Sequence, residues 1–389
     1  MYYGDNCVRK LSNLILALII IISLSACIGT PQITAEERLF PPISLKFLDK
    51  YEIQPQNFQD TPIGGLSAIT YDRQSDRFYA LSDDRSEQAP ARFYTLNINI
   101  TTTEEQAAKI EGITVENVTF LKDQTGQTYS SQTIDPEGIV LSPRDTLFIS
   151  SEGVPEQGIN PFLGEFDPTT GQLQQELRLP QRYLMATDTE TEPQGVENNL
   201  GFEPLTISAT STLKDDPFRV FTATEASLKQ DTGSTPPVNI PVRLLHYVIS
   251  PVGPPVLLAE HLYLLDEMPK GAIANGLTEL LALPREGSWL SLERTFGLFG
   301  FGAKLFQVVN SGASETSTIA SFKEGIEGIK PLRKKLLLDL ETLDIELDNL
   351  EGMTLGPRLS DGSESLFLIS DDNFNTDQKT QLLLFKLNA

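Results

Sequence analysis

Cysteine, histidine and tryptophan are nearly absent from this 389-residue chain, which has two, two and one of them respectively. Cys7 lies before an apolar run near the N-terminus and Cys27 lies just after it, so the rest of the chain has neither a disulfide nor a thiol nucleophile. His246 and His261 are too few for a histidine-rich zinc site, and neither lies beside a serine motif that would indicate a hydrolase triad. The fold must therefore be stabilised by its core.

Positive charge is also scarce. The chain has 30 Lys and Arg residues against 53 Asp and Glu residues, which gives a formal net charge of −23. This balance argues against nucleic acid and anionic lipid headgroups as partners. It favours solubility and the binding of cations, and we expect a monomer.

Only one long apolar run is present, over residues 11–24, and Arg9 and Lys10 precede it. Small residues then lead to Cys27. About 14 apolar residues are too few to span a bilayer as an ordinary transmembrane helix. The alternative is an uncleaved membrane anchor. The pattern predicts a lipoprotein signal peptide over residues 1–26, lipidation of Cys27, a tether over residues 27–43 and a folded domain over residues 44–389.

A lipoprotein signal implies an exported protein that is held by lipid at the cell envelope. The residue after the cysteine is Ile28, so the aspartate of an inner-membrane retention signal is missing. We therefore expect the outer membrane or periplasm, with the lipid as the membrane contact.

An internal repeat dominates the rest of the sequence. Its first half is a short apolar stretch that recurs about every 66 to 75 residues, at 64–69, 135–140, 201–206, 275–280 and 349–354. Its second half is a strand-like run that ends in a hydroxyl and an acid, at 79–84, 147–152, 220–225, 289–293 and 366–372. Repeats of this length with strand chemistry are typical of propellers.

Each repeat has room for two more strands. Runs rich in Val, Ile, Leu, Phe and Tyr follow the first two, separated by Gly, Pro and Asp. The fifth repeat has one more run only, 381–387, and residues 45–53 can supply the missing strand. The sequence thus predicts an all-β fold, a propeller of five four-stranded blades closed by pairing of its N- and C-terminal strands. Six blades are the alternative, with additional starts at 111–114 and 327–329, and residues 332–343 form either a strand or a short helix.

Acids recur at two positions in these repeats. Because the first two strands of a blade are antiparallel, the start of the first and the end of the second lie at one end of the sheet. These carboxylates should ring one mouth of the central channel. Those at first-strand starts are Glu137, Glu203 and Glu351, and those at second-strand ends are Asp83, Asp84, Glu152, Glu225, Glu293, Asp371 and Asp372.

Other polar residues nearby fit turns better than ligands. Asp135, Asn275 and Asn349 precede or open first strands, and we interpret them as turn formers. The same holds for Asp72, Asp76 and Asp167, which lie in hairpin turns. For every acid above, the competing interpretation is that it binds backbone N–H groups of its own loop.

Crowded carboxylates repel one another, and several cannot stay ionised together without a cation. Oxygen ligands without Cys or His select a hard ion, Ca²⁺ first and Mg²⁺ second. Arg85 and Arg294 each follow a terminal acid. They can neutralise the acids internally, or bind a phosphate or carboxylate of a substrate in bidentate fashion.

Together these motifs resemble the phytase-like family, described by the esterase-like activity of phytase. The resemblance spans residues 60–387 and rests on the segments 64–67, 80–85, 135–138, 149–153, 201–205, 292–294, 349–353 and 370–374. It implies a β-propeller and calcium-dependent hydrolysis of a phosphoester. The chain departs from the family at Glu152, one acid where a pair is common, at Pro204, where glycine is usual, and in insertions at 186–199 and 230–241.

Two functions follow. The first is a metal-dependent phosphoesterase that acts on a phosphorylated small molecule, with Arg85 and Arg294 on the phosphate and one of Glu137, Glu203 and Glu351 as the base. The second is a propeller without catalytic activity that binds a ligand or protein at the cell envelope.

Overall fold

The computed structural model describes residues 34–102, 108–186, 193–209, 211, 213–233 and 239–388. The chain divides into two units, Met1–Pro42 and Ile43–Ala389. The described part of the first unit contains one short helix, α2 (Ala35–Leu39), which begins with a capping box between Thr34 and Glu37. Among the described residues, no helix is long and apolar enough to cross a membrane. The predicted signal peptide and Cys27 lie outside them.

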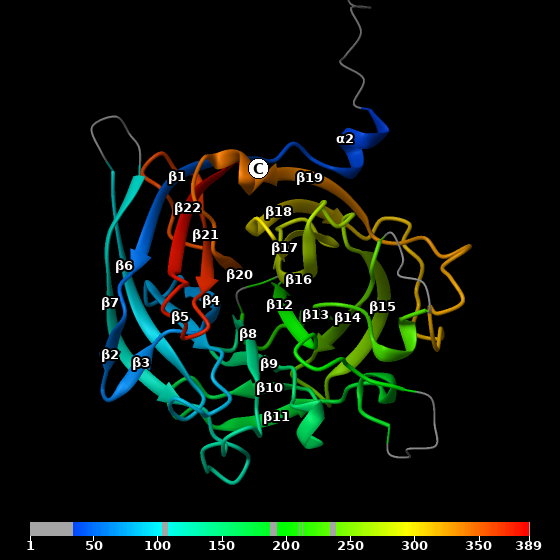
Figure 1. The fold of residues 1–389 in the computed structure, drawn as a ribbon, viewed down its shortest axis with the longest axis horizontal. Helices are drawn as coiled ribbons and strands as arrows, with labels where there is room; N and C mark the ends of the chain where they lie inside the picture. The colour runs from blue at the N-terminus through cyan, green and yellow to red at the C-terminus, as the bar shows by residue number, and fades with distance from the viewer. Residues whose placement is uncertain are drawn as a thin grey trace, which may run out of the picture. The chain divides into compact units, whose positions relative to one another are not determined.

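The second unit is a propeller of five four-stranded antiparallel sheets (Figure 1). The first blade is β4 (Leu66–Asp72), β5 (Arg77–Ser82), β6 (Arg92–Thr102) and β7 (Ala108–Phe120), and the second is β8 (Pro136–Leu141), β9 (Leu147–Ser151), β10 (Phe162–Phe166) and β11 (Leu173–Leu177). The third is β12 (Phe202–Ala209), β13 (Phe218–Thr224), β14 (Pro241–Ile249) and β15 (Val256–Leu264). The fourth is β16 (Ala272–Ala282), β17 (Ser288–Gly297), β18 (Gly300–Val309) and β19 (Arg333–Asp339). The fifth is β20 (Asn349–Leu355), β21 (Glu364–Asp371), β22 (Thr380–Asn388) and β1 (Ser44–Ile53).

The first strand of each blade lies innermost. β4 contacts β8 and β20, and β12 contacts β8 and β16, so these strands surround the centre in chain order. A small hairpin of β2 (Gln56–Phe58) and β3 (Thr61–Ile63) precedes the first blade. The prediction of an all-β propeller with five blades is confirmed.

The ring closes through the two ends of this unit. β1 pairs with β22 from Ser44 opposite Asn388 to Ile53 opposite Thr380, with one irregularity between Phe47 and Asp49. This pairing covers what would otherwise be an open sheet edge. The predicted closure is confirmed.

The segments that suggested a sixth blade lie elsewhere. Residues 111–114 belong to β7, the outer strand of the first blade, and residues 327–329 lie in the loop between β18 and β19. The segment after that loop combines both forms that the sequence allowed. It is the strand β19 followed by a 3₁₀ turn, η4 (Leu340–Leu343).

The core lies between the blades. Side chains alternate along β17, so Trp289 packs on Phe221 of the third blade, with ring centroids 4.9 Å apart, while Leu290 and Leu292 pack with Leu350 of the fifth blade. Each blade therefore buries both faces, which explains why first strands such as β8 and β12 are nearly continuous runs of buried residues.

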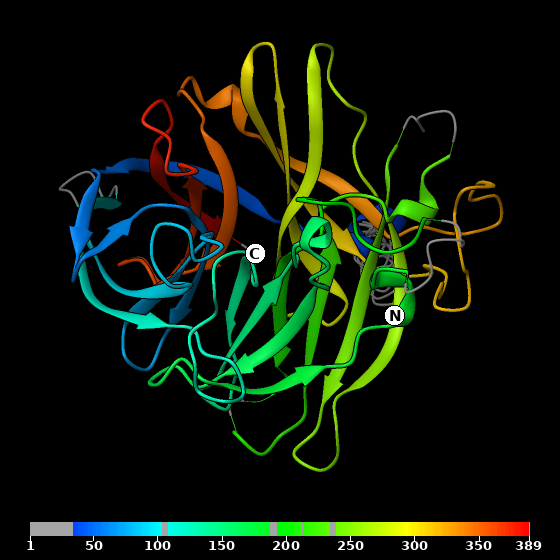
Figure 2. The same cartoon turned by 60° about the horizontal axis from the view of Figure 1, so that its bottom comes forward.

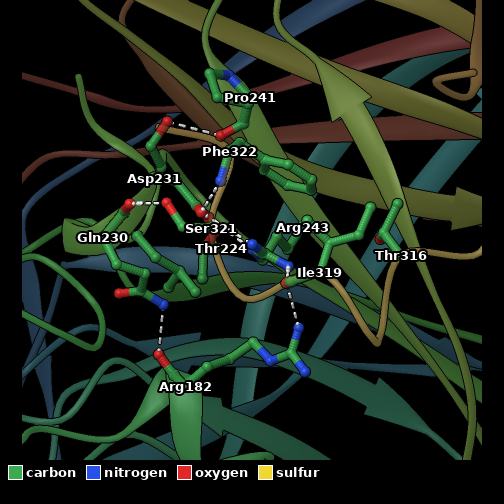
Figure 3. Close-up of polar contacts among 12 residues, drawn as sticks. Arg182, Thr224, Gln230, Asp231, Pro241, Arg243, Thr316, Ile319, Ser321 and Phe322 are labelled. Atoms are coloured by element: carbon green, nitrogen blue, oxygen red, sulfur yellow. Dashed lines mark hydrogen bonds and ion pairs between the residues drawn. The ribbon is translucent and has the colours of Figure 1, made fainter. Parts of the chain in front are cut away.

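A buried ionic network holds the long loop between β18 and β19 to the third blade (Figure 3). Arg243 of β14 is fully buried and donates from Nε and Nη2 to both oxygens of Asp231, at 2.6 and 2.9 Å. Its Nη1 donates to Glu260 Oε1 at 2.6 Å and to the carbonyl of Ile319 at 3.1 Å, and its guanidinium stacks over Phe322. The loop is thus fixed by charge-assisted hydrogen bonds.

Candidate metal centre

A β-bulge occurs at the same place in all five first strands. The irregularities lie between Leu66 and Ala68, Pro136 and Ile139, Phe202 and Leu205, Leu277 and Glu279, and Leu350 and Gly352. A bulge re-aims the side chain that it carries. The bulges contain Ser67, Glu137, Glu203, Thr278 and Glu351, so the three glutamates predicted at first-strand starts occupy equivalent positions around the channel.

The ends of the second strands form an outer ring. Backbone N–H groups of Asp83, Glu152 and Glu225 donate to Gly65, Asp135 and Gly201 at 2.6, 3.0 and 2.7 Å. In the fourth and fifth blades, the corresponding pairs are Arg294 with Gly276 and Asp371 with Asn349. The equivalent residues are therefore Asp83, Glu152, Glu225, Arg294 and Asp371, and in the fourth blade a cation takes the place of an acid.

Glu293, a predicted metal ligand, lies one residue before this ring. Because side chains alternate along a strand, the shift sends Glu293 to the other face of β17. Its oxygens accept hydrogen bonds from the hydroxyl of Tyr263 at 2.5 Å and the N–H of Asp266 at 2.7 Å, and it pairs with Lys334. The structure does not bring Glu293 to the other acids.

Asp84 and Asp372 are also predicted ligands whose oxygens are already engaged. Asp84 accepts backbone N–H groups of residues 87–89 and pairs with the fully buried Arg92 at 2.6 Å. Asp372 accepts the N–H groups of Gly65 and Phe374 and the hydroxyl of Thr380. Both carboxylates stabilise loops, which is the competing interpretation that the sequence left open.

Two groups of three carboxylates gather at the mouth. Asp83, Asp135 and Glu137 each offer an oxygen within 4.8 Å of the others, and Glu152, Glu203 and Glu225 do the same. Each group draws on two neighbouring blades, because a second-strand end meets the next first strand. Asp135, which the sequence suggests as a turn former, has a buried carboxylate that belongs to the first group. With Glu351, Asp371, Arg85 and Arg294, the two groups make up what we call the acid mouth.

Two arginines partly neutralise the acid mouth. Arg85 donates from Nε and Nη2 to the two oxygens of Asp135 at 2.7 and 2.5 Å, and from Nη2 to Asn199 Oδ1 at 2.7 Å. Nη2 of Arg294 lies 3.1 Å from Glu351 Oε1 and 3.3 Å from Glu225 Oε1. The Nε of Arg294 is buried and has no hydrogen-bond partner. Arg85 therefore binds Asp135 and Asn199, whereas Arg294 keeps a donor without a partner.

Burial raises the pKa of every carboxyl group in the acid mouth, and repulsion adds to this in most of them. The pKa values of Asp83, Glu137, Glu152 and Glu203 are raised well above their ordinary range by loss of solvation and then by neighbouring acids. Burial raises the pKa of Glu351 to about 7, against the opposing attraction of Arg294. Without a cation, the acid mouth must therefore hold protons, and a cation would replace them.

The donor set fits a hard cation. Glu203 Oε2 is buried and has no hydrogen-bond donor, and the buried side-chain oxygens of Asn275 and Asn349 also lack one. A buried acceptor without a donor is costly unless an ion or water satisfies it. The two groups contain carboxylate oxygens only, which are the ligands of Ca²⁺ and Mg²⁺. The described residues thus include two sites that can hold a metal ion.

Glu279 is a buried acid that the sequence analysis did not single out. It follows the bulge of β16, and its Oε1 accepts the N–H groups of Leu205 at 3.0 Å and Leu280 at 2.8 Å. It therefore joins β12 to β16. The sequence does contain a signal for Glu279, because it is an acid at a position where the other repeats have apolar residues.

Apolar side chains close the channel beneath the acids. Two residues beyond each bulge lies one buried apolar residue, and the five are Ile69, Ile139, Leu205, Leu280 and Met353. On their far side, they line a pocket of about 390 Å³ at the opposite mouth. These five side chains thus separate the acid mouth from that pocket.

Three motif serines bind backbone. The hydroxyls of Ser82, Ser150 and Ser370 donate to the carbonyls of Gly64, Glu203 and Lys379. His246 stacks on Phe221, and His261 contacts the carbonyl of Ser314. Within the described residues, these contacts give no serine triad.

Comparisons with known proteins decide the family. The family model of the phytase-like domain, described as the esterase-like activity of phytase, matches residues 61–374. The chain belongs to the phytase-like family. The match covers both carboxylate groups and all five bulges.

Solved structures with a similar fold are distant from this phytase-like protein. An endo-arabinase from Bacteroides thetaiotaomicron is 9% identical over 82% of this chain and 93% of its own, with a TM-score of 0.40. An α-L-arabinofuranosidase from Podospora anserina is 10% identical over 88% of this chain and 97% of its own, with a TM-score of 0.39. No curated protein matches the chain.

Proposed function

We propose that this protein is an exported, lipid-anchored, calcium-dependent phosphoric ester hydrolase that works at the acid mouth. The observation that carries the proposal is the two groups of three carboxylates, in each of which one oxygen per residue lies within 4.8 Å of the others. In the second group, which is buried, Glu203 also has an oxygen without a hydrogen-bond donor. Membership of the phytase-like family supports the reaction class. The substrate would be a phosphorylated small molecule, and the partners would include neither nucleic acid nor a second copy of the chain.

Calcium is the expected ion, and magnesium is the alternative. Asp83, Asp135 and Glu137 would hold one ion, and Glu152, Glu203 and Glu225 a second. Ca²⁺ accepts irregular sets of carboxylates, whereas Mg²⁺ needs near-octahedral geometry. A bound ion would polarise the phosphoryl group and lower the pKa of the attacking water.

The remaining residues of the acid mouth supply binding and proton transfer. Arg294, which keeps a free donor, would bind phosphoryl oxygens, and Arg85 would keep Asp135 in position. Glu351 has a pKa of about 7 and belongs to neither carboxylate group, so it can exchange a proton near neutral pH. In the reaction, the water oxygen bonds to phosphorus as the P–O bond to the alcohol breaks. Glu351 takes the water's proton and then gives it to the departing alkoxide oxygen, so that the alcohol leaves neutral.

The test uses the purified full chain with p-nitrophenyl phosphate and bis-p-nitrophenyl phosphate, in Ca²⁺ or in EDTA. We expect turnover that needs Ca²⁺. Glu203→Gln, which removes a carboxylate of the second group, should lower it at least about tenfold. The control variant Asp372→Asn, whose carboxylate only binds Gly65, Phe374 and Thr380, should keep the Ca²⁺ dependence.

Two outcomes would count against the proposal. Absence of Ca²⁺-dependent turnover on both esters would leave a propeller that binds a ligand without catalysis. Equal activity in Ca²⁺ and EDTA would exclude the metal. The anchor has its own test, because labelled palmitate should enter the wild-type chain in bacteria and not the Cys27→Ser variant.

A further inference from the structure

An apolar tip stands on the fourth blade beside the acid mouth. It consists of the turn before β16 and the hairpin between β17 and β18, which project beyond the rest of the ring in Figure 2, in yellow-green and yellow. Single exposed apolar side chains are normal, but several in one place mark an interaction site. The tip exposes Met268, Ile273, Phe296, Leu298 and Phe299, by 37%, 69%, 38%, 81% and 88%.

The apolar tip has a defined structure. The N–H of Leu298 donates to the carbonyl of Gly271 at 3.0 Å, which joins the two turns. Phe299 covers Gly271, where a Cβ would come within 2.9 Å of its ring. Phe296 and Phe301 stack with their centroids 4.8 Å apart. These side chains are held in place although folding buries few of them.

Strand register places part of this tip directly above the acid mouth. Phe296 lies two residues beyond Arg294 on β17, so both side chains lie on one face, with their backbones about 7 Å apart. β17 and β18 pair without a bulge, and Phe301 lies opposite Phe296 on that face. Phe296 and Phe301 therefore lie on the same face of the sheet as Arg294, which contacts Glu225 and Glu351.

The hairpin between β17 and β18 carries no charge beside a highly charged site, whereas the turn before β16 contains Asp266, Glu267 and Lys270. Residues 295–303 have no ionisable side chain, in a chain whose net charge is −23. A substrate with many phosphates would need cationic groups along this wall. A substrate with one phosphoryl group and an apolar remainder would put its charge at Arg294 and its carbon atoms on the aromatic rings.

We propose that the substrate is a phosphoester with an alkyl or aryl group, which packs on Phe296 and Phe301 while its phosphoryl group lies at Arg294. This inference rests on the proposed function and names its substrate class. Apolar contact on one wall recovers part of the free energy of burying each methylene. Selectivity should therefore increase with the length of the alkyl group.

The first experiment compares methyl and octyl p-nitrophenyl phosphate, which share charge and leaving group, below the concentration at which the octyl ester aggregates. We expect kcat/KM in Ca²⁺ to be about tenfold higher for the octyl ester. The double variant Phe296→Ser, Phe301→Ser should bring the ratio near one. Val252→Ser, which removes a side chain that is 83% exposed in another turn, should leave the ratio unchanged. Equal kcat/KM values in the wild type would overturn the inference and leave the hydrolase intact.

A second experiment separates this inference from catalysis. Octylphosphonate should bind the full chain in Ca²⁺ about tenfold more tightly than methylphosphonate by calorimetry, and the double variant should lose the difference. If neither ester is hydrolysed but the phosphonates differ in this way, the hydrolase proposal is wrong, and binding of the alkyl group to Phe296 and Phe301 is supported. Equal phosphonate affinities would overturn the inference. If the double variant also binds phosphatidylcholine vesicles more weakly than the wild type, the two rings contact a lipid surface instead.

Discussion

A Cβ atom on Gly276 would lie 1.9 Å from Oε1 of Glu225, so this glycine leaves the space that the carboxylate occupies. The N–H of the next residue, Leu277, donates to the carbonyl of Glu225 at 3.0 Å. A side chain at position 276 would therefore have to displace the Glu225 carboxylate. The Glu225 carboxylate can approach those of Glu152 and Glu203 because Gly276 has no side chain.

Gly276→Ala should weaken calcium binding without unfolding the ring. The new methyl group would push the Glu225 carboxylate away from Glu152 and Glu203, because the side chain is softer than the strands. We expect the calcium affinity, measured by calorimetry, to fall about 10- to 100-fold. Gly112→Ala is the matched control, since a Cβ there meets no atom within 4 Å. Equal affinities in the two variants would mean that Glu225 is not a ligand.

Calcium should raise the melting temperature of the wild type. At a free concentration one hundred times the Kd, binding adds about 2.7 kcal/mol to the free energy of unfolding. Calorimetry in Ca²⁺ and in EDTA measures the rise. Glu203→Gln should reduce the rise and should also stabilise the apo protein at neutral pH, because glutamine is neutral without taking up a proton, whereas burial raises the pKa of Glu203 and forces it to hold one. Asp167→Asn, in a turn far from the acids in sequence, should preserve the rise. A melting temperature that does not change in millimolar Ca²⁺ would exclude both sites.

In EDTA, the protein should lose stability as the pH rises through neutrality. The folded pKa of Glu351 is about 7 and its ordinary value is 4.5, so between these values the folded protein keeps a proton that the unfolded chain releases. The free energy of unfolding should fall by about 1–3 kcal/mol across this window and stay low above it. Ca²⁺ should reduce the fall, because its affinity increases as the ligands lose protons.

The comparison with Glu351→Gln isolates this carboxyl group, because His246 acts in the opposite sense. Burial lowers the pKa of His246 to about 4, so stability from this group is lost as the pH falls from 6.5. The wild type and the variant both contain His246, so its contribution to the free energy of unfolding is the same in both. Urea unfolding from pH 5 to pH 8 should show a smaller decline in the variant. The same slope in both would mean that Glu351 does not hold the proton.

Arg243→Met should destabilise the protein by about 3–5 kcal/mol, because it leaves Asp231 as a buried charge without its ionic partner and leaves Glu260 with Arg182 alone, at 3.5 Å. Denaturant unfolding measures the loss. Arg333→Met removes an exposed arginine of β19 and should change stability by less than about 0.5 kcal/mol. A loss below about 1 kcal/mol for Arg243→Met would show that the network relaxes.

The sequence predicted the fold because the information is local and repeated. Each pair of half-motifs gives a first and a second strand, and five pairs give five blades. The end strands, 381–387 and 45–53, needed only the rule that an open edge is avoided, and β22 and β1 agree with them to within a few residues. The β-bulges were not predicted, although they are what aims Glu137, Glu203 and Glu351.

The candidate site was predicted only in part, because it depends on single-residue register. Aligning Glu293 with the other terminal acids places it one residue early, and the equivalent residue is Arg294. Asp84 and Asp372 look like Asp83 and Asp371 in the sequence, and only the loop N–H groups distinguish them. Asp135 resembles a turn residue until the first blade brings Arg85 to it.

The pairing of Ser44 with Asn388 has a consequence for how the chain folds. These residues are 344 positions apart, and the fifth sheet needs both. During synthesis, four sheets can form in order while the fifth waits for the last strand. Closing so long a loop costs entropy that only the completed sheet repays. The nascent protein should therefore remain an open, aggregation-prone arc until β22 is made, and a chain that lacks β22 should not become native.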